Sequence, residues 1–134
     1  MKKIIFVFLL LPFLNFAQQD NTWKLYNNCK VVANGKAGEQ SLYEVHKVDV
    51  GKLKLKYFPN DGRKLWSNSF IIMDNDRVEI LRTNNNKNTL AIDNAILNNQ
   101  KSIIVYIISK PNDPIMASKI RIRTVPLVLI KQLD

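Results

Sequence analysis

The chain has 134 residues, a formal net charge of +9, one cysteine and one histidine. Its length suits one domain with its own hydrophobic core. The single cysteine, Cys29, excludes an intramolecular disulfide, and the single histidine, His46, excludes any zinc site that needs two histidines. Cys29 is expected to be a small buried hydrophobic residue because Val31 and Val32 follow it; the alternative is a disulfide-linked dimer.

The first 17 residues have the pattern of a signal peptide. Met1-Lys2-Lys3 is positively charged, Ile4 to Phe16 is apolar, and Ala17 is a small residue where a signal peptidase can cut. The apolar run is shorter than the roughly 20 residues that a membrane span needs. We therefore expect a signal peptide over residues 1–17 and a single all-β domain over residues 18–134. That domain would have a charge of +7 and no transmembrane span, and would be periplasmic or secreted.

Short β-type segments separated by turn residues follow one another along the rest of the chain. The clearest is residues 52–57, where Leu53, Leu55 and Tyr57 alternate with lysines and are expected to face the core. Residues 93–97 are ambiguous between a strand and one helical turn. The remaining expected strands are residues 23–26, 29–33, 42–50, 64–73, 77–82, 90–92, 103–108 and 119–131.

Turn chemistry and side-chain alternation predict several local details. Residues 59–62, Pro-Asn-Asp-Gly, predict a tight turn that pairs residues 64–73 with residues 52–57 as a hairpin. The uneven alternation of residues 42–50 predicts a β-bulge near His46 and Lys47. In residues 77–82, Val78 and Ile80 are expected to face inward.

The C-terminal third contains the two most apolar runs, residues 103–108 and 125–130. Both lack clean alternation, which is typical of strands buried on both faces. Pro126 cannot donate a hydrogen bond to a sheet, so its strand is expected to be an edge or a bulged strand. Its apolar residues 127–130 must then be covered by residues 90–97, by the loop at 111–116, or by another chain in a homodimer or hetero-complex.

Eight or nine short strands with regular turns predict an all-β fold, an antiparallel β-sandwich. The alternative is an up-and-down β-barrel. Asn21-Thr22-Trp23 resembles the Gly-x-Trp opening of the lipocalins, apart from the missing glycine, over these three residues. That resemblance implies an eight-stranded barrel that carries a small apolar ligand.

The candidates for catalysis are few, and none forms a recognisable motif. Cys29 and His46 could act as nucleophile and base only if they met in space, and no Gly-x-Ser-x-Gly sequence is present. Residues 74–76, Asp-Asn-Asp, favour a hairpin turn over a calcium loop, since the following glycine is missing. No catalytic residue, metal site or cofactor is predicted. Carboxylates for glycoside hydrolysis would have to come from Glu39, Glu44, Asp49, Asp74, Asp76 and Asp93.

Two basic stripes are the most organised polar feature. Residues 52–57 and residues 119–123 each carry three cations at alternate positions, so each strand would present them on one face. If the two strands shared a sheet, six cations would cover one surface. The alternative is an ordinary solvated face, because lysines also protect strands from aggregation. The candidate binding residues are Lys52, Lys54, Lys56, Lys119, Arg121 and Arg123.

These features favour a non-enzymatic exported module that binds or supports other molecules. A basic sheet face suits an anionic polysaccharide, an envelope surface or an acidic partner protein. Nucleic acid is not expected as a partner, since export removes it and no nucleic-acid-binding motif is present. The alternatives are a barrel that carries an apolar ligand and a small carboxylate-dependent glycoside hydrolase.

Overall fold

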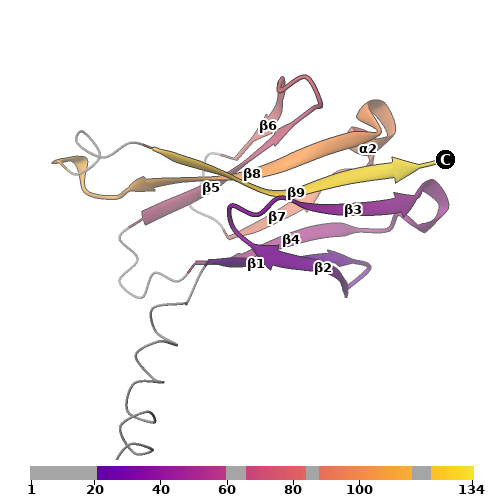
Figure 1. Cartoon of the computed structure of the whole chain (residues 1–134), viewed down its shortest axis with the longest axis horizontal. Helices are drawn as coiled ribbons and strands as arrows, with labels where there is room; N and C mark the ends of the chain where they lie inside the picture. Colours follow the sequence, from indigo (N-terminus) through magenta and orange to yellow (C-terminus); the bar gives the residue numbers. More distant parts are fainter. Residues whose placement is uncertain (1–20, 60–65, 84–87, 116–121) are drawn as a thin grey trace, which may run out of the picture.

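The computed structural model describes residues 21–59, 66–83, 88–115 and 122–134, and places them in two stacked β-sheets (Figure 1). The predicted β-sandwich is confirmed. The two sheets do not close into a barrel, so the lipocalin-like alternative is wrong. In chain order the elements are β1 (Thr22–Asn27), β2 (Lys30–Lys36), β3 (Ser41–His46), η1 (Lys47–Asp49), β4 (Leu53–Phe58), β5 (Trp66–Met73), β6 (Glu79–Arg82), β7 (Thr89–Ile92), α2 (Asn94–Gln100), β8 (Ser102–Pro111) and β9 (Arg123–Leu133).

The first sheet has four antiparallel strands in the order β2-β1-β4-β7. Its central strand β4 alternates as predicted: Leu53, Leu55 and Tyr57 are buried, whereas the residues between them face solvent. Strand β1 follows the same rule, because Trp23 and Leu25 are fully buried. Each strand therefore contributes one face to the core and the other to the molecular surface.

The second sheet has five strands in the order β3-β9-β8-β5-β6. All its neighbours are antiparallel except β3 and β9, which run parallel, and this departs from the expected antiparallel sandwich. Strands β2 and β3 form the edges of different sheets and are joined by residues 37–40. Because the chain crosses from one sheet to the other there, β3 does not form a hairpin and instead joins the second sheet beside β9.

The predicted hairpin between residues 52–57 and residues 64–73 is wrong. Strand β4 already has β1 on one side and β7 on the other, so β5 has no free edge to pair with. Strand β5 lies in the second sheet, and its residues Phe70 and Ile72 belong to the same core cluster as Leu55. Strands β4 and β5 therefore lie in different sheets, and of the turn predicted at residues 59–62 only Pro59 lies within the described residues.

Strand β9 is an interior strand with a bulge, so the bulge is confirmed and the edge position is wrong. Its register with β8 shifts at Val105 and Tyr106, where Leu127 is the additional residue between the paired Pro126 and Val128. A proline is tolerated beside a bulge because the regular ladder is interrupted there. The Pro126 carbonyl accepts a hydrogen bond from the Gly38 N–H at 3.1 Å.

The C-terminal apolar run was predicted to be covered by another segment, and this is confirmed with residues 90–97 as the cover. Leu127, Val128 and Ile130 are fully buried, and Leu90 and Leu97 belong to the same core cluster. The remaining edge of β9 is covered by β3, which was not among the expected covers. No second chain is needed at this strand.

Two local expectations differ from the structure, and one that was left open is resolved. The bulge near His46 and Lys47 is instead the end of β3 followed by the short 3-10 helix η1. Val78 is 58% exposed, whereas Ile80 packs against the core as predicted. The ambiguous segment is a helix, α2, because the Asp93 side chain accepts a hydrogen bond from the Ala95 N–H and caps its first turn.

Candidate binding surface

The three predicted lysines of the first stripe lie together on the outer face of the four-stranded sheet. Lys54 and Lys56 are on β4, and Lys52 directly precedes it at a position of the same parity. The residues between them, Leu53 and Leu55, are buried. Successive residues on one face of a strand are about 6.6–6.8 Å apart. The stripe is therefore a linear row of cations along the centre of the sheet.

The structure adds residues from the neighbouring strands. Lys24 of β1 lies opposite Lys56, and Lys36 of β2 lies opposite Thr22 of β1. Tyr26 lies opposite Lys54. Sequence reasoning missed these residues, although the buried Trp23 and Leu25 already imply that their neighbours face solvent. We call this surface the basic face: Lys24, Lys36, Lys52, Lys54 and Lys56, with the aromatic rings of Tyr26 and Phe58.

The charges on the basic face are concentrated rather than balanced. Lys24 and Lys56 are direct cross-strand neighbours, a like-charge arrangement that destabilises a sheet. The two ammonium groups each contact a different aromatic ring. Lys24 Nζ lies 5.7 Å from the centre of the Phe58 ring, and Lys56 Nζ lies 5.2 Å from the centre of the Tyr26 ring. Within the described part of the chain, Lys24, Lys52, Lys54 and Lys56 form no ion pair.

The second predicted stripe does not extend this surface. Arg123 begins β9 in the other sheet, so the condition that the two stripes share a sheet is not met. Lys119 and Arg121 lie outside the described residues. Arg123 lies near Tyr57. Burial raises the pKa of the Tyr57 phenol above its usual range, and a hydrogen bond with Asn21 and the charge of Arg123 oppose that rise.

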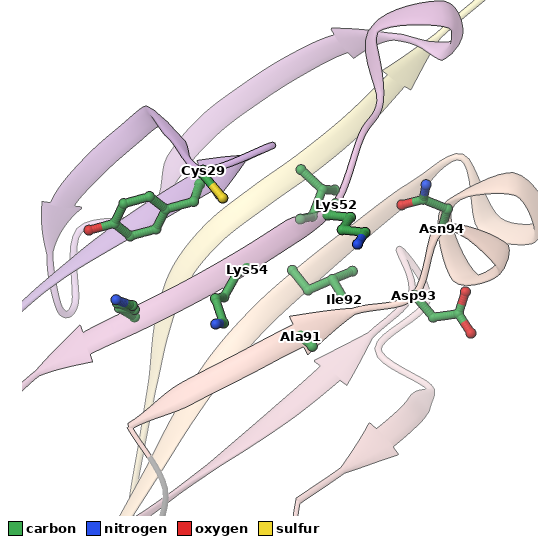
Figure 2. A pocket seen from close by; sticks show the side chains of 10 residues that line it. Cys29, Lys52, Lys54, Ala91, Ile92, Asp93 and Asn94 are labelled. Carbon is green, nitrogen blue, oxygen red and sulfur yellow. The ribbon is translucent and has the colours of Figure 1, made fainter.

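A pocket of about 700 Å³ lies on the basic face. Its floor follows one cross-strand row, since Tyr26 pairs with Lys54 and Lys54 pairs with Ala91. Figure 2 shows Lys54 on β4 and Lys52 just before its start, with Ala91 on β7 beside them. The lining residues are Tyr26, Cys29, Lys52, Leu53, Lys54, Lys56, Ala91, Ile92, Asp93 and Asn94.

The β1–β2 turn forms one rim of this pocket and carries Cys29. Asn28 and Cys29 have φ values of 51° and 68°, as both central residues of a type I′ turn require. Cys29 is exposed, so the expectation of a buried cysteine is wrong. A left-handed turn at the end of a hairpin faces away from the core, and the apolar neighbours Val31 and Val32 are themselves exposed on the edge strand β2.

Hydrogen bonds fix this turn to the residues that precede β4. The Asn28 N–H donates to the Lys52 carbonyl at 3.0 Å, and the Lys52 N–H donates to Asn28 Oδ1 at 2.9 Å. The Gly51 N–H donates to Asn27 Oδ1 at 2.8 Å. A Cβ atom at Gly51 would lie 2.2 Å from the Asn28 amide group, so only glycine fits there without movement. The rim therefore has a defined position relative to Lys52.

The other predicted chemistry is not assembled among the described residues. Cys29 lies in a turn of the first sheet and His46 ends a strand of the second, and no hydrogen bond joins them. Asp74 Oδ1 accepts the N–H groups of Asp76 and Val78 at 2.9 Å each, which is the predicted hairpin-turn role. No group of three metal-ligating side chains occurs within residues 21–59, 66–83, 88–115 and 122–134.

Comparison with protein-family models, with curated proteins and with solved structures finds no match for this chain. Among the helices that the structure describes, none is both long and apolar enough to cross a membrane. The expected signal peptide at residues 1–17 lies outside the described residues.

Proposed function

We propose that this protein is an exported, non-enzymatic binding module whose basic face binds an anionic glycan. The observation that most directly supports this proposal is the cross-strand pair of Lys24 and Lys56, which lie side by side without a carboxylate partner in the described chain. A solvated sheet face is as easily built from lysine and glutamate in alternation, which stabilises neighbouring strands. A face that keeps like charges together gains from an anion that neutralises them.

A glycan suits the shape and the chemistry of this surface better than a compact anion does. The lysines extend over β1, β2 and β4, so an extended chain can contact them in succession. The rings of Tyr26 and Phe58 lie beside these cations, each contacted by one ammonium group, and their remaining surface suits the C–H groups of sugar rings. Carboxylate or sulfate groups on the same chain would then lie beside the ammonium groups.

Charge reversal on the two sheets tests this proposal. The double variant Lys54→Glu/Lys56→Glu places two carboxylates on the basic face, and the matched control Lys110→Glu/Lys131→Glu makes the same charge change on exposed positions of the second sheet. On immobilised heparin, we expect the first variant to elute at less than about half the salt concentration needed for the unaltered protein, because screening competes with each ammonium contact. The control variant should show a much smaller decrease in the salt concentration needed for elution.

Equal losses for the two double variants would mean that net charge, and not the basic face, decides retention. Unchanged retention of the first variant would also contradict the proposal. Far-ultraviolet circular dichroism of both variants establishes that any loss is not due to unfolding. All four substituted side chains are at least partly solvent-accessible, so effects on the free energy of unfolding should stay within about 0.5 kcal/mol.

A further inference from the structure

The structure points to a more specific site within this surface: we propose that the pocket of about 700 Å³ binds a single acidic sugar unit, one that carries a carboxylate or a sulfate. This inference rests on the proposed glycan-binding function and names the place where one sugar is recognised. The pocket volume falls in the range of about 300–1,000 Å³ that is typical of small-molecule sites. A disaccharide has the size of such ligands.

The anionic group is expected at the row of lysines on one side of the pocket. Lys52, Lys54 and Lys56 all line it, and within the described chain none of them forms an ion pair. Lys56 is held over the Tyr26 ring, which leaves Lys52 and Lys54 as the two cations free of ring contacts. A carboxylate or sulfate placed between these two can accept charge-assisted hydrogen bonds from both.

The floor between the cations and the opposite rim is apolar. Ala91 presents only a methyl group, and Ile92 is 4% exposed, so neither offers a polar atom from its side chain. Tyr26 lies on β1, on the other side of Lys54 from Ala91, and adds an aromatic ring to the pocket there. A sugar ring combines an apolar C–H face with hydroxyl groups at its periphery, and the apolar floor suits that face.

The opposite rim distinguishes a sugar from a simple anion. Asp93 and Asn94 lie there, at the start of α2 (Figure 2). The carboxylate of Asp93 repels an inorganic anion, but it accepts a hydrogen bond from a sugar hydroxyl, and the Asn94 amide can both donate and accept. Asp93 Oδ1 is fixed by the Ala95 N–H at 3.0 Å, so the group is already oriented before any ligand arrives. A ligand that uses every side of the pocket therefore combines an acidic end with hydroxyl groups, whereas a fatty acid contacts the cations and the apolar floor but offers no hydroxyl group to Asp93 or Asn94.

The third side of the pocket is also preformed. The turn that carries Cys29 is bound to Lys52 through Asn28 in both directions, and Gly51 leaves room for that contact. The sugar site does not have to be ordered on binding, which removes one of the costs of association.

Titration calorimetry and amide NMR can test the site with defined probes. The probes are a disaccharide of galacturonate, its fully methyl-esterified form, and a disaccharide that carries one 6-sulfate. We expect the first or the third to bind, with amide shifts at residues 26–29, 52–56 and 91–94. The methyl ester, which has the same ring without the charge, should bind at least about tenfold more weakly. Comparison of the first and third probes tells whether carboxylate or sulfate is preferred.

Two variants separate this site from general charge attraction. Ala91→Phe fills the floor without changing any charge, and it should weaken disaccharide binding at least tenfold while retention on heparin is kept. Asp93→Asn can still cap α2 through its amide oxygen, but it replaces the second carboxylate oxygen, the acceptor for a sugar hydroxyl, with an NH2 group that only donates. It should weaken the disaccharide about fivefold, although it removes a negative charge.

The outcomes distinguish the two levels of the proposal. If heparin retains the protein but neither acidic disaccharide shifts the pocket amides, the sugar site is wrong and the broader function stands. If Asp93→Asn binds the disaccharide more tightly, the pocket is only an electrostatic site and the inference is again wrong. If neither heparin nor the disaccharides bind, the proposed function fails together with the site.

Discussion

The outer face of the four-stranded sheet carries the lysines and aromatic rings of the basic face, whereas the outer face of the five-stranded sheet carries a row of apolar residues that crosses four strands. Leu42, Leu129, Ile104 and Met73 are successive cross-strand neighbours over β3, β9, β8 and β5. Leu42 is 55% exposed. Both surfaces arise from the same two-residue alternation of strands, so the difference is one of side-chain choice and not of backbone geometry.

The two outer faces also differ in how charges are arranged. On the second sheet, Glu44 lies beside Lys131 in the parallel register, and Arg82 Nε is 2.6 Å from Glu79 Oε1. On the basic face, Lys24 lies beside Lys56 instead. The same chain therefore balances charges on one sheet and concentrates them on the other. Nothing in strand geometry requires this contrast, and the proposed binding of an anion by the basic face accounts for it.

The largest effect that we expect from the difference between the two outer faces is on the free energy of unfolding. Ile71 points to the outer face of the second sheet and lies outside the main core cluster, yet it is only 3% exposed. We expect Ile71→Ala to lower the free energy of unfolding by about 2–4 kcal/mol, because a buried aliphatic side chain is lost. Lys54→Ala on the basic face should change it by less than about 0.5 kcal/mol. Urea denaturation followed by tryptophan fluorescence measures both.

Similar values for the two variants would remove the distinction between a surface that packs and one that binds. A useful control is Ile108→Ala, since Ile108 is 7% exposed on the same outer face. It should resemble Ile71→Ala rather than Lys54→Ala.

The next prediction concerns the turn that positions the pocket rim. Gly51→Ala places a Cβ atom 2.2 Å from the Asn28 amide group, so the Asn28 side chain must leave the position in which it accepts a hydrogen bond from the Lys52 N–H. We expect a loss of about 1–3 kcal/mol in the free energy of unfolding, the usual cost of overpacking. Denaturation in urea provides the measurement.

Asn28→Gly supplies the matched control for that clash. It removes the side chain that Gly51→Ala would meet, while glycine keeps the positive φ of the turn. In the double variant the two effects should be less than additive, because the clash no longer exists. Strict additivity would show that the close contact is not the cause.

Alternation along the sequence was sufficient to predict the sandwich and the exposed row of Lys52, Lys54 and Lys56, because period two is a local property. It could equally have revealed Lys24 from its buried neighbours. The failed predictions depended on which strands pair. The order of the strands places Arg123 in a different sheet from the lysines, and β5 in a different sheet from β4. Turn residues alone do not determine that order. Cys29 was wrongly predicted to be buried. It lies in a left-handed turn, a conformation usually formed with glycine, and this turn exposes it despite its apolar character.

The smallest predicted effect uses Cys29 as a reporter of the local potential. Its exposed thiol lines the pocket beside Lys52 and Lys54. Iodoacetate is an anion and iodoacetamide is neutral, and both react with the same thiolate, so the ratio of their alkylation rates depends on the local charge. We expect this ratio to fall at least about threefold between about 0.01 M and about 1 M salt, as the screening length falls from about 30 Å to about 3 Å. Lys54→Gln should lower the ratio at low salt, and Lys110→Gln on the second sheet should not. If both substitutions act equally, the potential is spread over the whole molecule, and the contrast between the two faces does not hold.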